Sequence, residues 1–251
     1  MRRVSHVALA FVLSGAWPVT AQAATSEPNA AEFFRQPAAL VLVVALATLL
    51  PFAFMALTAF VKISTVLQIV KGAIGAQSVP SNSIIVALAA ALTLLAMAPV
   101  GTTIVERTTP IVAKGSTPDT FKALGEFAHA IGDPIHDFLR ANASAREKHR
   151  FFELAKRARP AAQRANVADD DWVVIIPAFV VTELLAAFAL GFLIYLPFLV
   201  IDLVISNVLL ALGMQMVTPS QVSLPFKLLL FVAIDGWGLI AQALVTGYHM
   251  S

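Results

Sequence analysis

The amino-acid sequence predicts an all-α, membrane-associated fold built of helical hairpins with long, kinked helices. Of the 251 residues, 59% are hydrophobic and only 13% are charged, whereas about a quarter of an average soluble protein is charged. The charges are also segregated: residues 106–171 hold 21 of the 32 Lys, Arg, Asp and Glu side chains, and residues 36–61 and 72–105 hold none. This pattern excludes a disordered chain, an ordinary soluble enzyme and a nucleic-acid binder with a basic surface.

The first element is a signal peptide over residues 1–23. Two arginines precede a short apolar run, and a small-x-small tripeptide ends at Ala23, which places cleavage between Ala23 and Ala24. An uncleaved anchor is the alternative interpretation. Cleavage leaves 15 basic and 15 acidic residues, so the mature chain is formally neutral. A short exterior segment, residues 24–37, follows.

Residues 38–105 form the first predicted hydrophobic hairpin. One helix covers residues 38–61, which is long enough to span a bilayer and is kinked at Pro51. A second begins at Ser81 or Asn82 and runs to residue 105. The connection between them carries two lysines and no acid, so we expect it on the cytoplasmic side.

Residues 106–171 form a polar, mainly helical domain, which this topology puts outside the cytoplasm. Pro118 and Pro134 indicate helices over residues 117–131 and 133–159, the second ended by Pro160. Its basic stretch is interpreted as a solvated helix face in preference to a lipid or nucleic-acid patch.

Residues 172–251 form the second hydrophobic hairpin. An apolar stretch over residues 173–210 is too long for one simple span, and Gly191 and Pro197 indicate bends. A loop near residues 213–223 leads to a last helix over residues 224–248, with Pro225 at its start.

Five ionisable side chains lie in these apolar regions, where a charge costs at least about 2.5 to 3.5 kcal/mol at the bilayer centre. They are predicted to form inter-helix or inter-subunit contacts; a proton relay and interfacial snorkelling are the alternatives. The five residues are Lys62, Glu183, Asp202, Lys227 and Asp235.

The loop after the long apolar stretch contains Met214, Gln215 and Met216. Methionine is flexible and apolar, so it can fill irregular gaps and repack. Spacing alone favours gap filling in a core, but several copies of such a loop around an axis would also close a pore.

No catalytic, cofactor-binding or metal-binding constellation is found. The chain has no cysteine, its histidines lack metal-ligand spacing, and no phosphate loop or nucleophile elbow occurs. We therefore expect a protein that is not an enzyme and has no cofactor.

Four segments resemble the signature blocks of the SctR/FliP family, the core export-gate proteins of injectisome and flagellar type III secretion systems. They cover residues 56–75, 176–184, 197–214 and 224–237. The resemblance extends over residues 38–105 and 134–248.

This resemblance implies several copies of the chain assembled with SctS and SctT around an axial channel. Unfolded secreted proteins would pass this gate in the bacterial inner membrane, with much of the body on the periplasmic side. SctU, SctV, the needle or inner-rod proteins and membrane lipid are the further implied partners, and nucleic acid is not one. Met214 and Met216 match the methionine gasket of the channel, where Gln215 departs from an all-Met run, and the five charges match positions of subunit contact.

Two other functions compete with this one. An ion-coupled secondary transporter would use Glu183, Asp202 and Asp235 as a proton path, but only a weak Leu-Pro-Phe recurrence hints at internal repeats. A receptor with an exterior ligand-binding domain is disfavoured by the small, cysteine-free polar segment. Between the two branches of the family, the short N-terminal segment favours an injectisome member.

Overall fold

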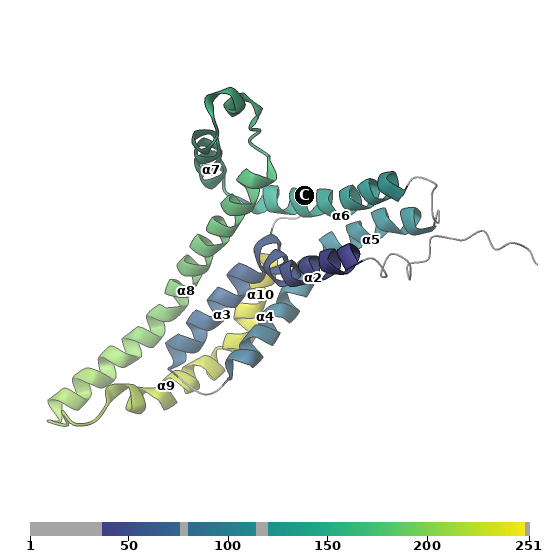
Figure 1. Ribbon diagram of the computed structural model, residues 1–251. Coiled ribbons are helices and arrows are strands. Elements are labelled where there is room, and N and C mark those ends of the chain that lie inside the picture. The colour runs from purple at the N-terminus through teal and green to yellow at the C-terminus, as the bar shows by residue number, and fades with distance from the viewer. Residues whose placement is uncertain (1–36, 76–79, 114–119, 249–251) are drawn as a thin grey trace, which may run out of the picture. The chain divides into compact units, whose positions relative to one another are not determined.

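A computed structural model describes residues 37–75, 80–113 and 120–248. Every regular element in these ranges is a helix (Figure 1), which confirms the predicted all-α class. The predicted signal peptide, with Ala23 and Ala24, lies outside the described residues. The helices are α2 (Pro37–Leu57), α3 (Phe60–Ile74), α4 (Asn82–Ala96), α5 (Ala98–Ala113), α6 (Thr120–Asn142), α7 (Ala145–Ala158), the 3-10 helix η1 (Ala161–Asn166), α8 (Trp172–Ala211), α9 (Pro219–Ala233) and α10 (Gly236–Thr246).

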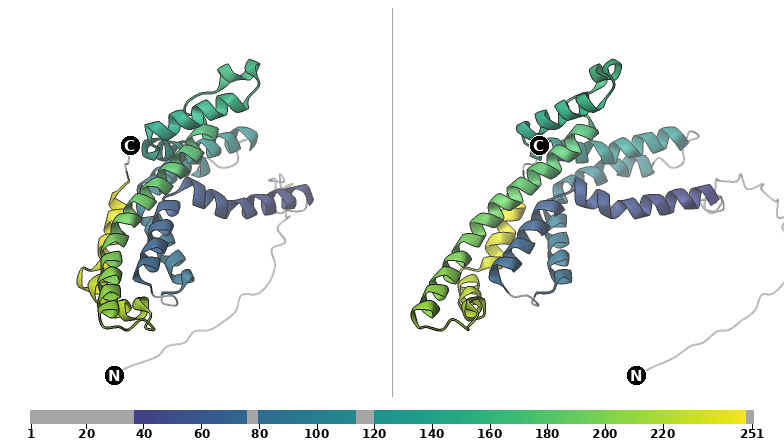
Figure 2. Two further views of the ribbon diagram at one scale, coloured as in Figure 1. Left: turned by 90° about the vertical axis from the view of Figure 1, so that its left-hand side faces the viewer. Right: turned by 60° about the vertical axis from the view of Figure 1, so that its left-hand side comes forward.

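The chain divides into two compact units, Met1–Thr48 and Leu49–Ser251. The described part of the first unit is the beginning of α2. In the second unit, α3 packs against α8, α4 and α9, and α6 and α7 also pack on α8 (Figure 2). The core is therefore centred on α3, whose Ile63, Leu67 and Val70 are fully buried.

The first apolar segment bends by 73° at Thr58 and Ala59, so the prediction of one helix over residues 38–61 is wrong. The Thr58 hydroxyl donates to the Phe54 carbonyl at 2.5 Å and accepts the Phe60 N–H at 3.3 Å. At the break the Thr58 hydroxyl therefore makes hydrogen bonds with backbone groups, in competition with the backbone hydrogen bonds of a continuous helix. The segment after the break, predicted as a connection, is α3.

A second bend, of 58°, separates α4 from α5 at Met97. The predicted cap is confirmed, because the Ile84 N–H donates to Ser81 Oγ at 3.4 Å. The helix expected to run unbroken to residue 105 is interrupted because Pro99 has no N–H and its ring crowds the carbonyl four residues earlier. The last apolar segment bends likewise, by 58° at Ile234 and Asp235, so the expected single helix over residues 224–248 is two helices.

In the polar segment, α6 continues through Pro134, so the predicted boundary at residue 133 is wrong. Burial stabilises the helix further on, where the Phe138 and Phe179 rings meet edge to face with centroids 5.7 Å apart, so that α6 packs on α8. The true boundary lies at Ser144, which caps α7. The end of α7 at Ala158, before Pro160, agrees with prediction.

Helix α8 has 40 residues without interruption, so its length is about 60 Å. Within the described residues it is the one helix long and apolar enough to cross a membrane, and the number rises to four if each bent pair forms one span. The prolines predicted as kinks, Pro51, Pro197 and Pro225, lie inside α2, α8 and α9, and none of them ends its helix. Gly191 has a packing role, since a Cβ there would collide with Ile69 of α3.

Candidate functional site: the methionine loop and the buried charges

The methionine loop connects α8 to α9. The Gly213 N–H donates to the Leu210 carbonyl and the Met214 N–H to the Leu209 carbonyl, both at 3.0 Å. This pair of bonds is a Schellman motif, in which the residue after the cap takes a left-handed conformation. Gly213 does so with φ 75°, which a side chain would disfavour. Met214 therefore leaves the end of α8 in a direction set by backbone hydrogen bonds.

The loop side chains point away from the core. Met216 is 99% exposed and Met214 45% exposed, and Gln215 is exposed between them. Gap filling within the core of a single chain is therefore not what these methionines do. Two flexible apolar side chains at the tip of a helical hairpin are suited to contact with a neighbouring chain or a passing polypeptide.

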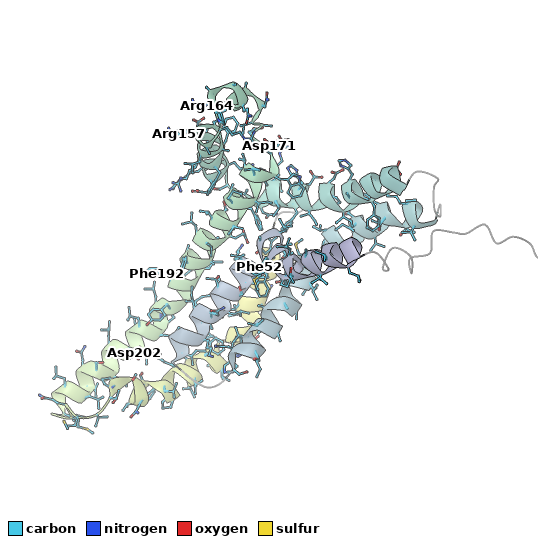
Figure 3. The ribbon with its side chains drawn as sticks, in the orientation of Figure 1. Phe52, Arg157, Arg164, Asp171, Phe192 and Asp202 are labelled. Carbon is cyan, nitrogen blue, oxygen red and sulfur yellow. The ribbon has the colours of Figure 1, made fainter. Side chains whose placement is uncertain are left out.

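A partly buried ion pair joins the two helices of this hairpin. Asp202 of α8 accepts from Lys227 Nζ and from Ser223 Oγ of α9, both at 2.6 Å. Lys227 and Ser223 are buried, and Asp202 lies on α8 beside α9 (Figure 3). We call Asp202, Ser223 and Lys227 the hairpin clamp. Removing two charges from water is offset here by direct pairing and by the serine hydrogen bond.

A second polar cluster joins three distant parts of the chain. The Tyr248 hydroxyl donates to Glu183 Oε2 at 2.5 Å and lies 3.3 Å from the Ala59 carbonyl oxygen. Lys62 Nζ lies over the Tyr248 ring, 4.4 Å from its centroid. All three side chains are buried. We call Lys62, Glu183 and Tyr248 the core cluster; it fastens the end of the chain to α3 and α8.

Asp235 belongs to neither group. It occupies the bend between α9 and α10 with a positive φ of 50°, and it is exposed. Its carboxylate lies over Gly238, and the Phe231 ring lies over Gly236, so a Cβ at either glycine would collide. Although Lys227 and Asp235 would share a side of one straight helix, the bend divides them between α9 and α10, and Lys227 bonds to Asp202 instead.

Sequence reasoning missed Ser223 and Tyr248. The spacing of Ser223 could have indicated its role, since it lies one helical turn before Lys227 and therefore on the same face of the helix. Nothing in the sequence near Tyr248 indicates its role, because its partner Glu183 is 65 residues away in the chain.

The surface of α8 beyond Glu183 is largely apolar and uncovered. Its exposed large side chains include Leu185, Phe188, Phe192, Leu203 and Leu210. Uncovered apolar surface on this scale indicates contact with lipid or with other protein chains. Among the residues that the structure describes, no group of three or more His, Asp or Glu side chains is placed to hold a metal ion.

Comparison with known proteins agrees with the sequence resemblance. Residues 43–244 match the model of the FliP family. The chain is 45% identical over 211 residues to the "Hypersensitivity response secretion protein HrcR" of Ralstonia nicotianae, covering 84% of this chain and 96% of that protein. It is 41% identical over 209 residues to "Yop proteins translocation protein R" of Yersinia pestis, covering 83% and 95%. It is 39% identical over 212 residues to "Virulence protein YscR" of Salmonella typhimurium, covering 84% and 97%.

The matches to the relatives cover most of this chain and nearly all of each relative. The family-model match includes the positions of the hairpin clamp, the methionine loop and the bend at Asp235. The apolar helix α8 agrees with a membrane protein. The chain therefore belongs to the FliP family and is an SctR-type membrane subunit of a type III secretion export apparatus.

Proposed function

We propose that this chain is a structural subunit of the export gate, which conducts unfolded secreted proteins across the bacterial inner membrane. The observation that carries the proposal is the exposed methionine loop, Met214 to Met216, at the tip of a clamped hairpin. A loop held this firmly at its base and left uncovered at its tip is suited to line an opening. The proposal includes no catalytic step and no cofactor.

The gate would form from several copies of the chain with SctS and SctT, next to SctU and SctV. The uncovered apolar side chains of α8 support this assembly, since they need protein or lipid neighbours. Of the five predicted contact charges, Asp235 alone is exposed. We therefore assign Asp235 to a contact between subunits, and the other four to holding the helices of one chain. Needle or inner-rod proteins would adjoin the periplasmic side, where much of the body would stand.

In a ring of such loops, Met214 and Met216 would form an apolar seal that excludes water and ions. Because methionine side chains are flexible and unbranched, they would repack around an unfolded chain of any sequence. Gln215 would add hydrogen bonds between neighbouring loops at some loss of apolar contact.

An ion-coupled transporter needs carboxylates along one path. Glu183 accepts a hydrogen bond from Tyr248, and Asp202 accepts hydrogen bonds from Lys227 and Ser223. Asp235 lies exposed at a bend. The hydrogen bonds of Glu183 and Asp202, and the exposed place of Asp235, favour structural roles for these carboxylates over a proton path.

The assembly is tested by expressing the full chain with its genetic neighbours and measuring the mass of the detergent-extracted complex. We expect several copies together with two small hydrophobic proteins. A monomer under every extraction condition would refute the export-gate proposal.

The seal is tested with the double substitution Met214→Ala and Met216→Ala in the assembled complex. We expect the membrane to become permeable to small solutes, because two flexible side chains per subunit are removed from the closure. Met55→Ala is the matched control, since Met55 is as exposed as Met214 but lies on α2. Unchanged permeability of the double variant would exclude the sealing role.

A further inference from the structure

Helices α6 and α7 meet at a break at Ala143 and Ser144. Ser144 caps α7, because its hydroxyl accepts the Glu147 N–H at 3.3 Å. The N–H of Ser144 itself donates out of the helix, to Thr182 Oγ1 of α8 at 3.1 Å. The Thr182 hydroxyl in turn donates to the Ala178 carbonyl at 2.7 Å. One backbone donor thus ties the start of α7 to α8.

The local sequence contains a second acceptor for that same donor. Ser144 and Glu147 form the S-x-x-E pattern of a capping box, in which the glutamate side chain bonds back to the N–H of the cap residue. In this structure the box is half closed. The serine makes its bond, but Thr182 occupies the position that the Glu147 carboxylate would take.

The displaced carboxylate is buried and incompletely paired. Glu147 is 1% exposed. Its Oε2 accepts from Arg150 Nη1 at 2.9 Å, and Arg146 Nε lies 3.5 Å from Oε1. Among the described residues, Oε1 receives no hydrogen bond. A buried carboxylate oxygen without a hydrogen bond is costly, so packing α7 on α8 carries a penalty that release of α7 would remove.

We propose that α7 is a hinged arm that docks on α8 and undocks, with Thr182 and Glu147 competing for the Ser144 N–H. When α7 is docked, Thr182 holds the N–H and Glu147 is buried. When α7 is undocked, Glu147 closes the capping box and its carboxylate is solvated. The backbone donor is satisfied in both states, and the hinge is the break at Ala143 and Ser144.

The undocked arm would remain helical. Its last turn carries Lys156 and Arg157, which suit the negative end of the helix dipole. Lys156 Nζ also lies 3.9 Å from the centroid of the Phe152 ring on the preceding turn. The views in Figure 2 show α7 alongside the beginning of α8, from which it would swing as one piece.

The competition predicts opposite effects for two single substitutions. Thr182→Val removes the docked partner of Ser144 and should raise the undocked fraction about fivefold, the factor expected for one lost hydrogen bond. Glu147→Leu removes both the buried carboxylate and the undocked cap, and should lower that fraction about fivefold. In the Thr182→Val background Glu147 still caps only the undocked arm, so Glu147→Leu should lower the undocked fraction there too.

The readout is thiol labelling of a single cysteine in the full chain, assembled with its partners. The chain has no cysteine of its own. Ile175→Cys places a thiol at a fully buried position of α8 beside Lys148 and Phe152 of α7, so its labelling rate reports undocking. Ile63→Cys, buried in α3, is the control position and should label at one rate in every variant.

A higher labelling rate for Thr182→Val, together with a lower rate for Glu147→Leu in both backgrounds, supports the competition. Two controls complete the set. Thr246→Val removes a hydroxyl that bonds its own helix and should change nothing. Glu147→Gln removes the buried charge but keeps the ability to cap, so it should lower the labelling rate less than Glu147→Leu does in both backgrounds. If Glu147→Leu fails to lower the labelling rate in either background, Glu147 merely fastens α7 and the proposal is overturned.

Discussion

The hairpin clamp offers the sharpest test of the energetics. At 2.6 Å and an effective dielectric constant of about 20, the attraction between Lys227 and Asp202 is about 6 kcal/mol, most of which offsets desolvation. The side chain of Lys227 is 6% exposed and that of Asp202 30% exposed. Asp202→Leu leaves an ammonium buried without an anion and should cost about 3–5 kcal/mol. Lys227→Met leaves a carboxylate that still meets water and should cost about 2 kcal/mol.

The double variant Asp202→Leu and Lys227→Met should differ little from the native chain, since replacing a buried pair by apolar residues is often neutral. The assay is the thermal midpoint of the detergent-purified complex, where 1 kcal/mol corresponds to about 2–4 °C. We expect losses of roughly 10 °C for Asp202→Leu and roughly 5 °C for Lys227→Met. Lys71→Met, which removes an exposed bond to Asn82, is the control and should change the midpoint by less than about 3 °C. If the double variant loses the sum of the two single losses, the two residues do not act as a pair and the reasoning is refuted.

Tyr248→Phe removes the donor to the buried Glu183 carboxylate and should cost about 1–3 kcal/mol, seen as a lower thermal midpoint; an unchanged midpoint would show that the bond is dispensable. Gly191→Val should cost about 1–3 kcal/mol by colliding with Ile69, and Ile69→Ala should recover part of that loss in the double variant; absence of recovery would assign the effect to something other than this contact. Gly213→Ala should cost about 1 kcal/mol at its positive φ and raise solute leakage by redirecting the methionine loop, so a native midpoint with native leakage would contradict it.

The sequence predicted those features of the fold that depend on a residue type and its near neighbours in the chain. The gaps in the charge distribution located the apolar segments, Ser81 marked the start of α4, and Pro160 marked the end of α7. The four family blocks identified the family. Each of these signals depends on residues close together in the chain.

The bends were not predictable in the same way. Pro51, Pro197 and Pro225 were predicted to kink their helices, but the helices continue through them, because loss of one amide hydrogen bond can bend a helix without ending it. The actual break at Thr58 comes from a hydroxyl that bonds the backbone in two directions, and most threonines inside helices do not break them.

Pairing of the charges was equally hidden. Asp202 and Lys227 are 25 residues apart, and the apolar residues between them show no single buried face from which to deduce their meeting. Glu147 was misjudged in the other direction. A glutamate among basic residues in a polar segment is typical of a solvated helix face, but Glu147 is buried. Both outcomes depend on which helix packs where, which is a property of the whole fold.

The bends have a consequence for how the protein relates to the bilayer. Helices α3, α4 and α9 have 15 residues each, about 22 Å, whereas the hydrocarbon layer is about 30 Å thick. Each is thus too short to cross by itself, and α8, at twice the bilayer thickness, is too long. Such a hydrophobic mismatch in both directions cannot be relieved by tilting alone. The folded chain is therefore a poor match for lipid as its sole surroundings, and partner proteins are expected to supply the apolar environment that the bilayer does not.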